Sequence, residues 1–361
     1  MKYIGIDLHR RFSQICVYDA EATEEKIYRL DNDKLVLEDF FMQLGNDCKI
    51  AVEATGSWYW LVDLLQDMGL EILLSNPVQT KAIAYARVKN DTVDATTLTH
   101  LLRTDLLPTC WIPQKAERNL RDLLRIRLNF LCLRTQFKNV IRSILAKFNI
   151  NLERTNLWSG QGRDLLEETI SPAARGELTR LALPSPYCET IKQCLAHIDS
   201  LTEQIKYWEG VIHQQVVISE QAQRLLTVPG MGELSALTII YESGPIERFP
   251  SAKHYVSYAG LVPRNYGSAD KYWNGHLCKQ ANMYLKRIYV EVALAALRAS
   301  LTDSRLKWFY ERTMRRKGRF VARIALARKL AGIIYHMLKD GIDYPTCMVR
   351  NRMAERASQV L

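Results

Sequence analysis

Four carboxylates in the first hundred residues have the types and the order needed to hold a divalent metal. Asp7 ends the β-rich run "YIGID" and Glu53 ends the β-rich run "IAVE". Asp91 and Asp94 stand three residues apart in "KNDTVDATTL", a spacing that puts both side chains on one face of a helix. Clustered carboxylates repel one another unless a cation neutralises them. Oxygen ligands suit Mg²⁺, or Mn²⁺, and a pair of such ions can activate a nucleophile and stabilise the leaving oxygen in phosphodiester cleavage.

Each acid also has an ordinary structural explanation. An Asp after a strand is commonly a turn residue, and Asp91 or Asn90 could simply cap the helix. His9, two residues after Asp7, could lie at the metal edge or could be a plain turn histidine. The order strand-Asp, strand-Glu, helix-Asp-x-x-Asp is more specific than any single acid, and it favours a ribonuclease-H-like nuclease core.

A serine near the C-terminal third could act as a nucleophile. Ser268 lies between Gly267 and Ala269 in "GLVPRNYGSADKYWNG", with the basic residues Arg264 and Lys271 on either side. We expect this polar, aromatic stretch to be irregular. A glycine-flanked serine is normally only a loop residue, and no Ser-His-Asp arrangement is readable here, so activation would have to come from metals or basic groups.

The run "VPGMGELSALTII" predicts a helix, a tight turn and a second helix. Gly230 and Gly232 would let the turn approach a phosphate, and the N-terminus of the following helix offers free N–H groups. This resembles a helix–hairpin–helix grip on a nucleic-acid backbone. An ordinary corner between two helices would have the same pattern.

The elements that must position the acids follow from periodicity. Alternating strands and helices indicate an α/β domain with a mixed sheet at 1–110. We expect strands at 2–8, 12–20, 25–30, 48–54 and 70–77, and helices at 33–44, 57–70 and 91–104.

Two heptad seams predict long helices in a region at 111–220. Their apolar positions are Leu123, Ile126, Phe130, Leu133, Phe137, Val140 and Ile144 in the first seam, and Ile191, Cys194, Ile198, Leu201, Ile205, Trp208 and Ile212 in the second. The helices could pair as a coiled coil within the chain or between subunits. A third, mainly helical region is expected at 221–361, carrying Ser268.

Charge is concentrated at the C-terminal end. The 361-residue chain has a net charge of +10, and residues 301–361 hold 14 Lys and Arg against 5 Asp and Glu. Such a block favours a nucleic-acid partner, although a solubilising tail would also be basic. The candidate phosphate contacts are Arg315, Arg316, Lys317, Arg319 and Arg323. We find no membrane span, no signal-peptide core and no C-x-x-C pair, so we expect a cytoplasmic protein.

The chain resembles the insertion-sequence transposases that pair an N-terminal RuvC-like DEDD domain with a C-terminal serine domain, a group that includes pilin-gene invertases and bridge-RNA-guided recombinases. The resemblance extends over essentially the whole chain in the same order. It rests on "YIGID", "VEATGSWY", "NPVQTKAIAYARVKNDTVDATTL", "VPGMGELSA", "FPSAKHYVSYAGLVPRNYGS" and "CKQANMYLKRIYVEVA".

This resemblance implies an acidic tetrad at Asp7, Glu53, Asp91 and Asp94, a nucleophilic Ser268, and DNA recombination through a covalent phosphoserine with a divalent metal. It also implies donor and target DNA as partners, a structured guide RNA, and a homodimer or a tetramer built from dimers. A bacterial, nucleoid-associated location follows from the same comparison. Ala269 departs from the glycine that we expect after the serine.

Three hypotheses therefore remain open on the sequence. The first is an RNA-guided serine recombinase with a metal site, and the second is a metal-dependent nuclease or Holliday-junction resolvase without covalent serine chemistry. The third is a non-catalytic assembly protein that binds DNA or RNA. The four acids argue against the third hypothesis, and the segment around Ser268 argues against the second.

Overall fold

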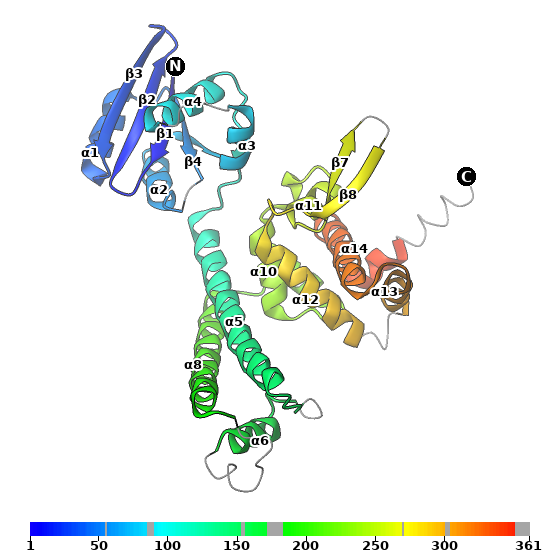
Figure 1. Ribbon diagram of the computed structural model, residues 1–361. Coiled ribbons are helices and arrows are strands. Elements are labelled where there is room, and N and C mark those ends of the chain that lie inside the picture. Colours follow the sequence, from blue (N-terminus) through cyan, green and yellow to red (C-terminus); the bar gives the residue numbers. More distant parts are fainter. Residues whose placement is uncertain are drawn as a thin grey trace. The chain divides into compact units, whose positions relative to one another are not determined.

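The computed structural model describes residues 1–54, 56–84, 90–152, 156–171, 183–268, 271–299 and 304–350 (Figure 1). The chain forms two compact units, Met1–Lys115 and Ala116–Leu361. The division into three regions at 1–110, 111–220 and 221–361 remains a prediction. Within the described ranges, every helix is too short or too polar to cross a lipid bilayer.

A mixed sheet forms the centre of the first unit, as the sequence predicts, and it has six strands. The pairs β1–β4 and β4–β5 are parallel, and the pairs β3–β2, β2–β1 and β5–β6 are antiparallel. In sheet order, the strands are β3 (Glu24–Asp31), β2 (Phe12–Asp19), β1 (Lys2–Leu8), β4 (Cys48–Glu53), β5 (Glu71–Ser75) and β6 (Thr109–Cys110).

Helices cover both faces of this sheet. They are α1 (Lys34–Leu44), α2 (Tyr59–Asp67), α3 (Pro77–Ile83) and α4 (Asp91–Arg103). The short α3 and β6 were not predicted. Ile4 and Ile6 of β1 pack in one cluster with Leu37 of α1 and Leu61 of α2. Because side chains alternate along a strand, the odd-numbered residues of β1 face the opposite side, where α4 lies.

Two long helices pair within the second unit. They are α5 (Lys115–Lys147) and α8 (Ser185–Gln215), and the shorter α6 (Gly160–Ile170) packs with α8 at one end. Arg127 of α5 bonds Glu209 of α8 at 2.8 Å, and the Phe137 ring stacks on the His197 ring at 4.8 Å. The contacts run in opposite sequence directions, so the pair is antiparallel and internal to the chain.

The residues of the two predicted heptad seams differ in how deeply they are buried. In α8, five of the seven predicted seam residues are buried: Ile191, Cys194, Ile198, Ile205 and Ile212. In α5, two predicted seam residues, Leu133 and Val140, are each 42% exposed. The α5 prediction is therefore wrong at these positions, because α5 turns a different face to its neighbours.

Among the described residues, the remaining elements of the second unit are helices and one hairpin. Its largest core brings together residues from α9 through α14. The elements are α9 (Glu220–Leu226), α10 (Glu233–Ser243), η1 (Ile246–Arg248), α11 (Ala252–Tyr258), β7 (Pro263–Ser268), β8 (Lys271–Leu277), α12 (Met283–Ala299), α13 (Ser304–Lys317) and α14 (Arg319–Asp340).

The segment around Ser268 is not irregular, so that prediction is wrong. Residues 263–268 and 271–277 form an antiparallel hairpin in which Gly267 pairs with Tyr272 and Ser268 with Lys271. Tyr272 and Trp273 are good β-formers, and backbone pairing between the strands outweighs the turn-forming Asn and Gly residues that suggested a loop.

Candidate metal centre and nucleic-acid interface

The N-terminus of α4 presents two acids beside β1. Asn90 is the N-cap, and its side-chain oxygen accepts from the Thr92 N–H at 2.9 Å. Asp91 and Asp94 occupy the first turn, where carboxylates also complement the helix dipole. Since Asn90 does the capping, the helix does not need Asp91 for that purpose.

Gly5 lets α4 approach the sheet closely. A Cβ atom added at Gly5 would lie 2.2 Å from the backbone oxygen of Ala95, which no real side chain tolerates. Thr99 of α4 also holds the helix against the sheet, because its hydroxyl donates a hydrogen bond to the Cys16 carbonyl oxygen of β2 at 3.1 Å. Gly5 and Asp7 point to the same face of β1, so this packing places the start of α4 beside Asp7.

Asp7, His9 and Asp91 form a cluster of possible metal ligands. Nε2 of His9 lies 3.1 Å from Oδ2 of Asp7 and 3.2 Å from Oδ2 of Asp91. One ligand atom from each of the three residues lies within 4.8 Å of the other two. Nε2 of His9 is buried and makes no hydrogen bond of good geometry within the described chain. A cation coordinated by this nitrogen and the two carboxylates would satisfy all three groups.

Burial raises the pKa of Asp7, which is only 7% exposed. His9 opposes that rise, while the charges of Asp94 and Asp91 add to it. The ionised acids therefore destabilise one another, and a divalent cation would remove that repulsion. The donor set fits the metals predicted from the sequence: carboxylate oxygens suit Mg²⁺ and Mn²⁺, and a histidine nitrogen is more usual for Mn²⁺.

Glu53 ends the strand next to Asp7. Ile6 of β1 is in register with Val52 of the parallel β4, so Asp7 and Glu53 are the next residues along two adjacent strands. Equivalent register positions project to the same face of a sheet. The structure thus places Glu53 on the correct strand end and face, and its role as a ligand remains a prediction. The sequence left the role of His9 open, and the structure brings its ring to the acids.

The hairpin positions the candidate nucleophile. Ser268 is the last residue of β7 and pairs with Lys271, the first residue of β8. The side chains of Ser268 and Lys271, and the whole of Ala269, lie outside the described residues. Arg264, earlier on β7, has an exposed side chain. The roles predicted for Ser268, Arg264 and Lys271 remain predictions.

A buried polar group anchors the chain that leaves this hairpin. Glu242 of α10 is fully buried and accepts hydrogen bonds from Arg125 at 2.6 Å and from Asn282 at 2.7 Å. Asn282 follows the hairpin, and its side-chain oxygen also accepts from the backbone N–H of Tyr284 and Leu285 at the start of α12. Arg121 completes the group at 3.2 Å from Glu242. The network joins α5, α10 and α12.

The two glycines of the predicted phosphate grip have different surroundings. Gly230 has a φ of 77°, and a Cβ atom there would lie 2.5 Å from the backbone of Ala295 in α12. This glycine thus serves the close packing of two backbones. Gly232 is the N-cap of α10, and nothing lies within 4 Å of where its Cβ would be. Phosphate contact at either glycine remains a prediction.

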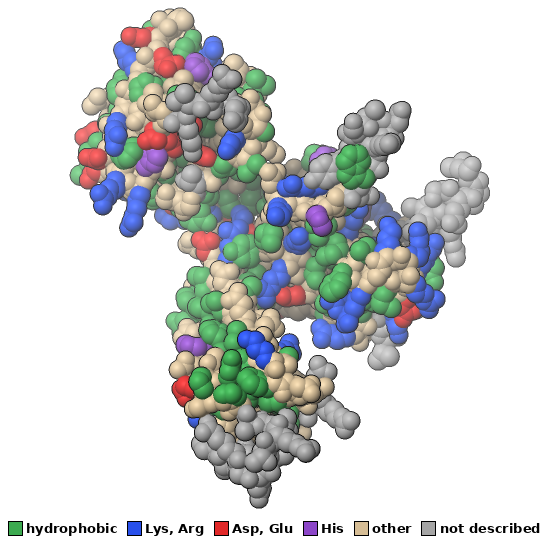
Figure 2. Space-filling model, viewed as in Figure 1, with side chains coloured by type: hydrophobic (Ala, Val, Ile, Leu, Met, Phe, Trp, Pro, Cys, Tyr) green, Lys and Arg blue, Asp and Glu red, His purple; other side chains and the backbone are tan. Residues whose placement is uncertain are grey.

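Basic side chains gather on α13 and α14 (Figure 2). Arg315, Arg316 and Lys317 form the last turn of α13, Gly318 reverses the chain with a φ of 81°, and Arg319 begins α14. These four cations are exposed, whereas Arg323 is half-buried. The solubilising tail considered from the sequence is instead a packed helical pair, with Leu326 and Leu330 in the core and cations outside.

Comparison with known proteins identifies two matching family models. The model described as "Transposase IS116/IS110/IS902 family" matches residues 222–311, and a DEDD transposase model of IS110 elements matches residues 4–150. The first contains the hairpin of Ser268, and the second contains all four acids.

Curated relatives match over nearly the full chain. A protein of Pseudomonas aeruginosa named "Probable family 20 transposase" is 28% identical over 94% of this chain and 98% of its own length. The transposase for insertion sequence element IS1111A of Coxiella burnetii is 24% identical over 94% of this chain and 90% of its own. The pilin gene-inverting protein of Moraxella bovis is 31% identical, over 28% of this chain and 30% of its own.

Proposed function

The chain belongs to the IS116/IS110/IS902 family of insertion-sequence transposases, and from this premise we propose that it cuts and rejoins DNA strands through a covalent phosphoserine. In this proposal the first unit is a ribonuclease-H-like, RuvC-like domain that holds Mg²⁺ or Mn²⁺ through Asp7, Glu53, Asp91 and Asp94. Ser268 is the nucleophile. The observation that supports the proposal most is that possible ligand atoms of Asp7, His9 and Asp91 lie within 4.8 Å of one another.

In the proposed serine step, one phosphodiester bond of the DNA is exchanged for a phosphodiester bond to Ser268. The Ser268 oxygen bonds to phosphorus while the bond from phosphorus to one deoxyribose oxygen breaks. The serine proton passes to a nearby base, and the departing sugar oxygen takes up a proton. A hydroxyl of a second strand then bonds to phosphorus while the bond from phosphorus to the Ser268 oxygen breaks. The base takes the proton of the attacking hydroxyl and Ser268 takes up a proton. When bound, the metal supplies positive charge to a phosphate oxygen, and Asp7 and Asp91 hold that charge in place.

We also propose that a structured RNA guides this reaction. Its base pairing would choose donor and target DNA, while the protein binds RNA shape and DNA backbone, a known division of labour. The basic α13 and α14 support a polyanion partner. A homodimer, or a tetramer formed as a dimer of dimers, is part of the same proposal and rests on the family alone.

A covalent-adduct assay tests the nucleophile. Purified protein, its co-purifying RNA, labelled donor DNA and Mn²⁺ are incubated, denatured and separated by size. We expect a protein–DNA adduct with the natural chain and none with Ser268→Ala, while DNA binding persists. Ser257→Ala is a matched control, because Ser257 is exposed on the neighbouring α11. An adduct that survives Ser268→Ala would overturn the assignment.

The same assay distinguishes the serine recombinase from the alternative hypothesis, an enzyme without covalent serine chemistry. A metal-dependent nuclease or Holliday-junction resolvase would release nicked DNA without any adduct, and Ser268→Ala would leave that cleavage intact. Asp91→Asn should abolish cleavage under either hypothesis.

Sequencing the nucleic acid bound to the purified protein tests the guide. The protein is isolated at low salt from cells that carry the intact element. We expect one structured RNA transcribed from the element itself, retained equally by Ser268→Ala. A random mixture of cellular RNA would contradict guidance and favour protein-directed recombination.

A further inference from the structure

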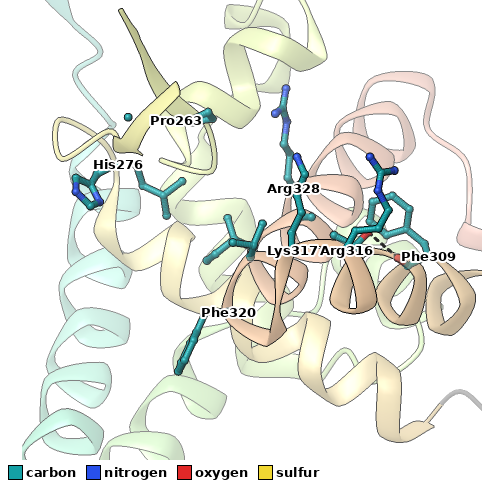
Figure 3. A pocket seen from close by; sticks show the side chains of 13 residues that line it. Pro263, His276, Phe309, Arg316, Lys317, Phe320 and Arg328 are labelled. Atoms are coloured by element: carbon teal, nitrogen blue, oxygen red, sulfur yellow. Dashed lines mark hydrogen bonds between the residues drawn. The ribbon is translucent and has the colours of Figure 1, made fainter. Parts of the chain in front are cut away.

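A cavity opens between the base of the hairpin and the α13–α14 pair. Its volume is about 700 Å³, within the roughly 300–1,000 Å³ range of pockets that hold small organic ligands. His276 and Leu277 of β8 line one side, and residues from Phe309 to Arg328 of α13 and α14 line the other (Figure 3). All of its lining residues belong to the second unit and are described.

Apolar side chains form much of this lining. They include Phe309, Phe320 and Ile324. Phe320, in the first turn of α14, is 80% exposed, although an aromatic ring normally loses most of its contact with water on folding. An exposed ring at the mouth of a concave site is a feature of binding surfaces.

Cations share the same lining. Arg316, Lys317 and Arg328 contribute to it, and none of the lining residues is acidic. Within the described chain, these three cations make no ion pair with a carboxylate. In Figure 3 the side chains of Arg316 and Arg328 extend toward one side, and the Phe320 ring extends toward the other. The cavity thus combines an aromatic wall with an uncompensated positive side.

We propose that this cavity binds an unstacked nucleotide of a single strand, with the base against the apolar wall at Phe320 and the phosphate at Arg316 and Arg328. The inference deepens the proposed function, because strand exchange and a folded RNA both expose unpaired nucleotides. Aromatic faces beside basic groups are the usual platform for single-stranded nucleic acid, since every base has a face that can stack.

A paired duplex fits the cavity less well. In a duplex the bases are stacked on one another, so only the charged backbone and groove edges could meet the protein. The apolar wall would then remain exposed to water. An unpaired nucleotide instead covers the wall with its base and neutralises the cations with its phosphate.

Equilibrium binding to short labelled strands tests the proposal. The probes are oligo-dT and oligo-U of about 12 nucleotides, a matching DNA duplex and an abasic strand of the same length. We expect the natural chain to bind the base-containing strand about tenfold more tightly than the abasic strand, in keeping with stacking of one base. Phe320→Ala should remove this preference and change duplex binding less than about twofold. Phe320→Tyr should restore the preference, because its ring keeps a stacking face.

Two controls separate stacking at the cavity from general effects. Tyr207→Ala removes another exposed aromatic ring, 63% exposed on α8, and should leave every affinity unchanged. Arg328→Ala should weaken the abasic and base-containing single strands alike, because it removes a phosphate contact. Tighter binding of oligo-dT would identify DNA as the source of the nucleotide, and tighter binding of oligo-U would identify RNA.

Two results would overturn the proposal: equal affinity of the natural chain for abasic and base-containing strands, or equal loss of single-strand and duplex binding in Phe320→Ala. The assay needs no cleavage, so it stands apart from the proposed chemistry. Ser268→Ala protein should bind as the natural chain does, and a failed adduct assay would leave the binding result intact.

Discussion

Asp7 is a buried acid in a cluster of acids, and its negative charge lowers the folding stability of the metal-free protein. Burial and the nearby charges of Asp91 and Asp94 raise its pKa, and His9 compensates only in part. An acid whose pKa is higher in the folded state stabilises the protein most at low pH. That stability is lost as the pH rises through the folded pKa.

Asp7→Asn should therefore raise the melting temperature in the presence of a chelator near neutral pH, by a few degrees. Adding Mn²⁺ should raise the melting temperature of the natural chain, because a ligand that binds only the folded state stabilises it, and should have little effect on the variant. DNA cleavage by the variant should be lost. Thermal melts with and without metal provide the measurement.

The matched comparison is Asp63→Asn, which changes an acid of the same unit on α2, outside the cluster. It should respond to Mn²⁺ as the natural chain does. A melting temperature that falls in Asp7→Asn under chelation would show that the repulsion inferred at this site is absent.

At the scale of single residues, the sequence could predict that Asp7 and Asp91 lie close together, but not that His9 joins them. Strand ends and the three-residue spacing are visible in the chain, and they place Asp7 and Asp91 correctly. The position of His9 depends on the turn between β1 and β2, where its N–H donates to the Phe12 carbonyl oxygen and its ring packs on that of Phe12 at 4.6 Å. Such a local ring contact has no sequence signature.

The packing of α4 on β1 decides whether the acids meet. Gly5→Ala should separate these elements, because its Cβ would clash with the Ala95 carbonyl oxygen at 2.2 Å. Forced overpacking commonly costs about 1–3 kcal/mol. We expect a lower unfolding free energy in chemical denaturation and weaker Mn²⁺ binding, since Asp91 moves away from Asp7.

Gly56→Ala provides the control for this change. Gly56 is in the same unit, and nothing lies within 4 Å of where its Cβ would be. Its stability and Mn²⁺ affinity should match those of the natural chain. If Gly5→Ala behaved in the same way, the close approach of α4 would not be what assembles the site.

Glu242 holds three helices of the second unit together. Its burial would raise its pKa, but the hydrogen bonds and charges of Arg125 and Arg121 outweigh that effect and lower the pKa. Glu242→Gln should destabilise the protein by about 3 kcal/mol, because two arginines lose the charge that compensates them. Denaturant unfolding measures this loss.

The pH dependence gives this prediction its control. The contribution of Glu242 is present above the unfolded-state pKa and is lost as the pH falls through the lower, folded-state pKa. The difference between the natural chain and Glu242→Gln should therefore shrink in acid. A difference that stays constant with pH would mean that Glu242 acts through packing rather than through its charge.

At the scale of elements, sequence periodicity predicts long helices and strands better than it predicts which segments pair with each other. Apart from the short α3 and β6, the strands and helices of the first unit follow from their own local periodicity. The face that α5 turns to α8 does not, because Arg127 and Arg134 of α5 bond across to Glu209 and Thr202, and leave Leu133 exposed. The hairpin was missed for the same reason: its stability comes from pairing between two segments.

At the scale of the whole molecule, the uneven charge governs nucleic-acid binding. Each phosphate neutralised by a Lys or Arg releases condensed counterions, so each contact lowers log affinity by roughly 0.9 for a tenfold rise in salt concentration. Replacing Arg315, Lys317 and Arg319 with Gln should reduce the slope of log affinity against log salt by about 2–3. Fluorescence anisotropy with duplex DNA over a series of salt concentrations measures this slope.

An equal loss of charge elsewhere tests whether location matters or only net charge. Lys192→Gln, Lys206→Gln and Lys253→Gln remove three exposed cations from α8 and α11. If α13 and the start of α14 contact the phosphates, this control should retain the natural slope, because those cations release no counterions on binding. Equal slopes for the two triple variants would show that long-range attraction by the net charge of +10 is responsible, rather than contact by these helices.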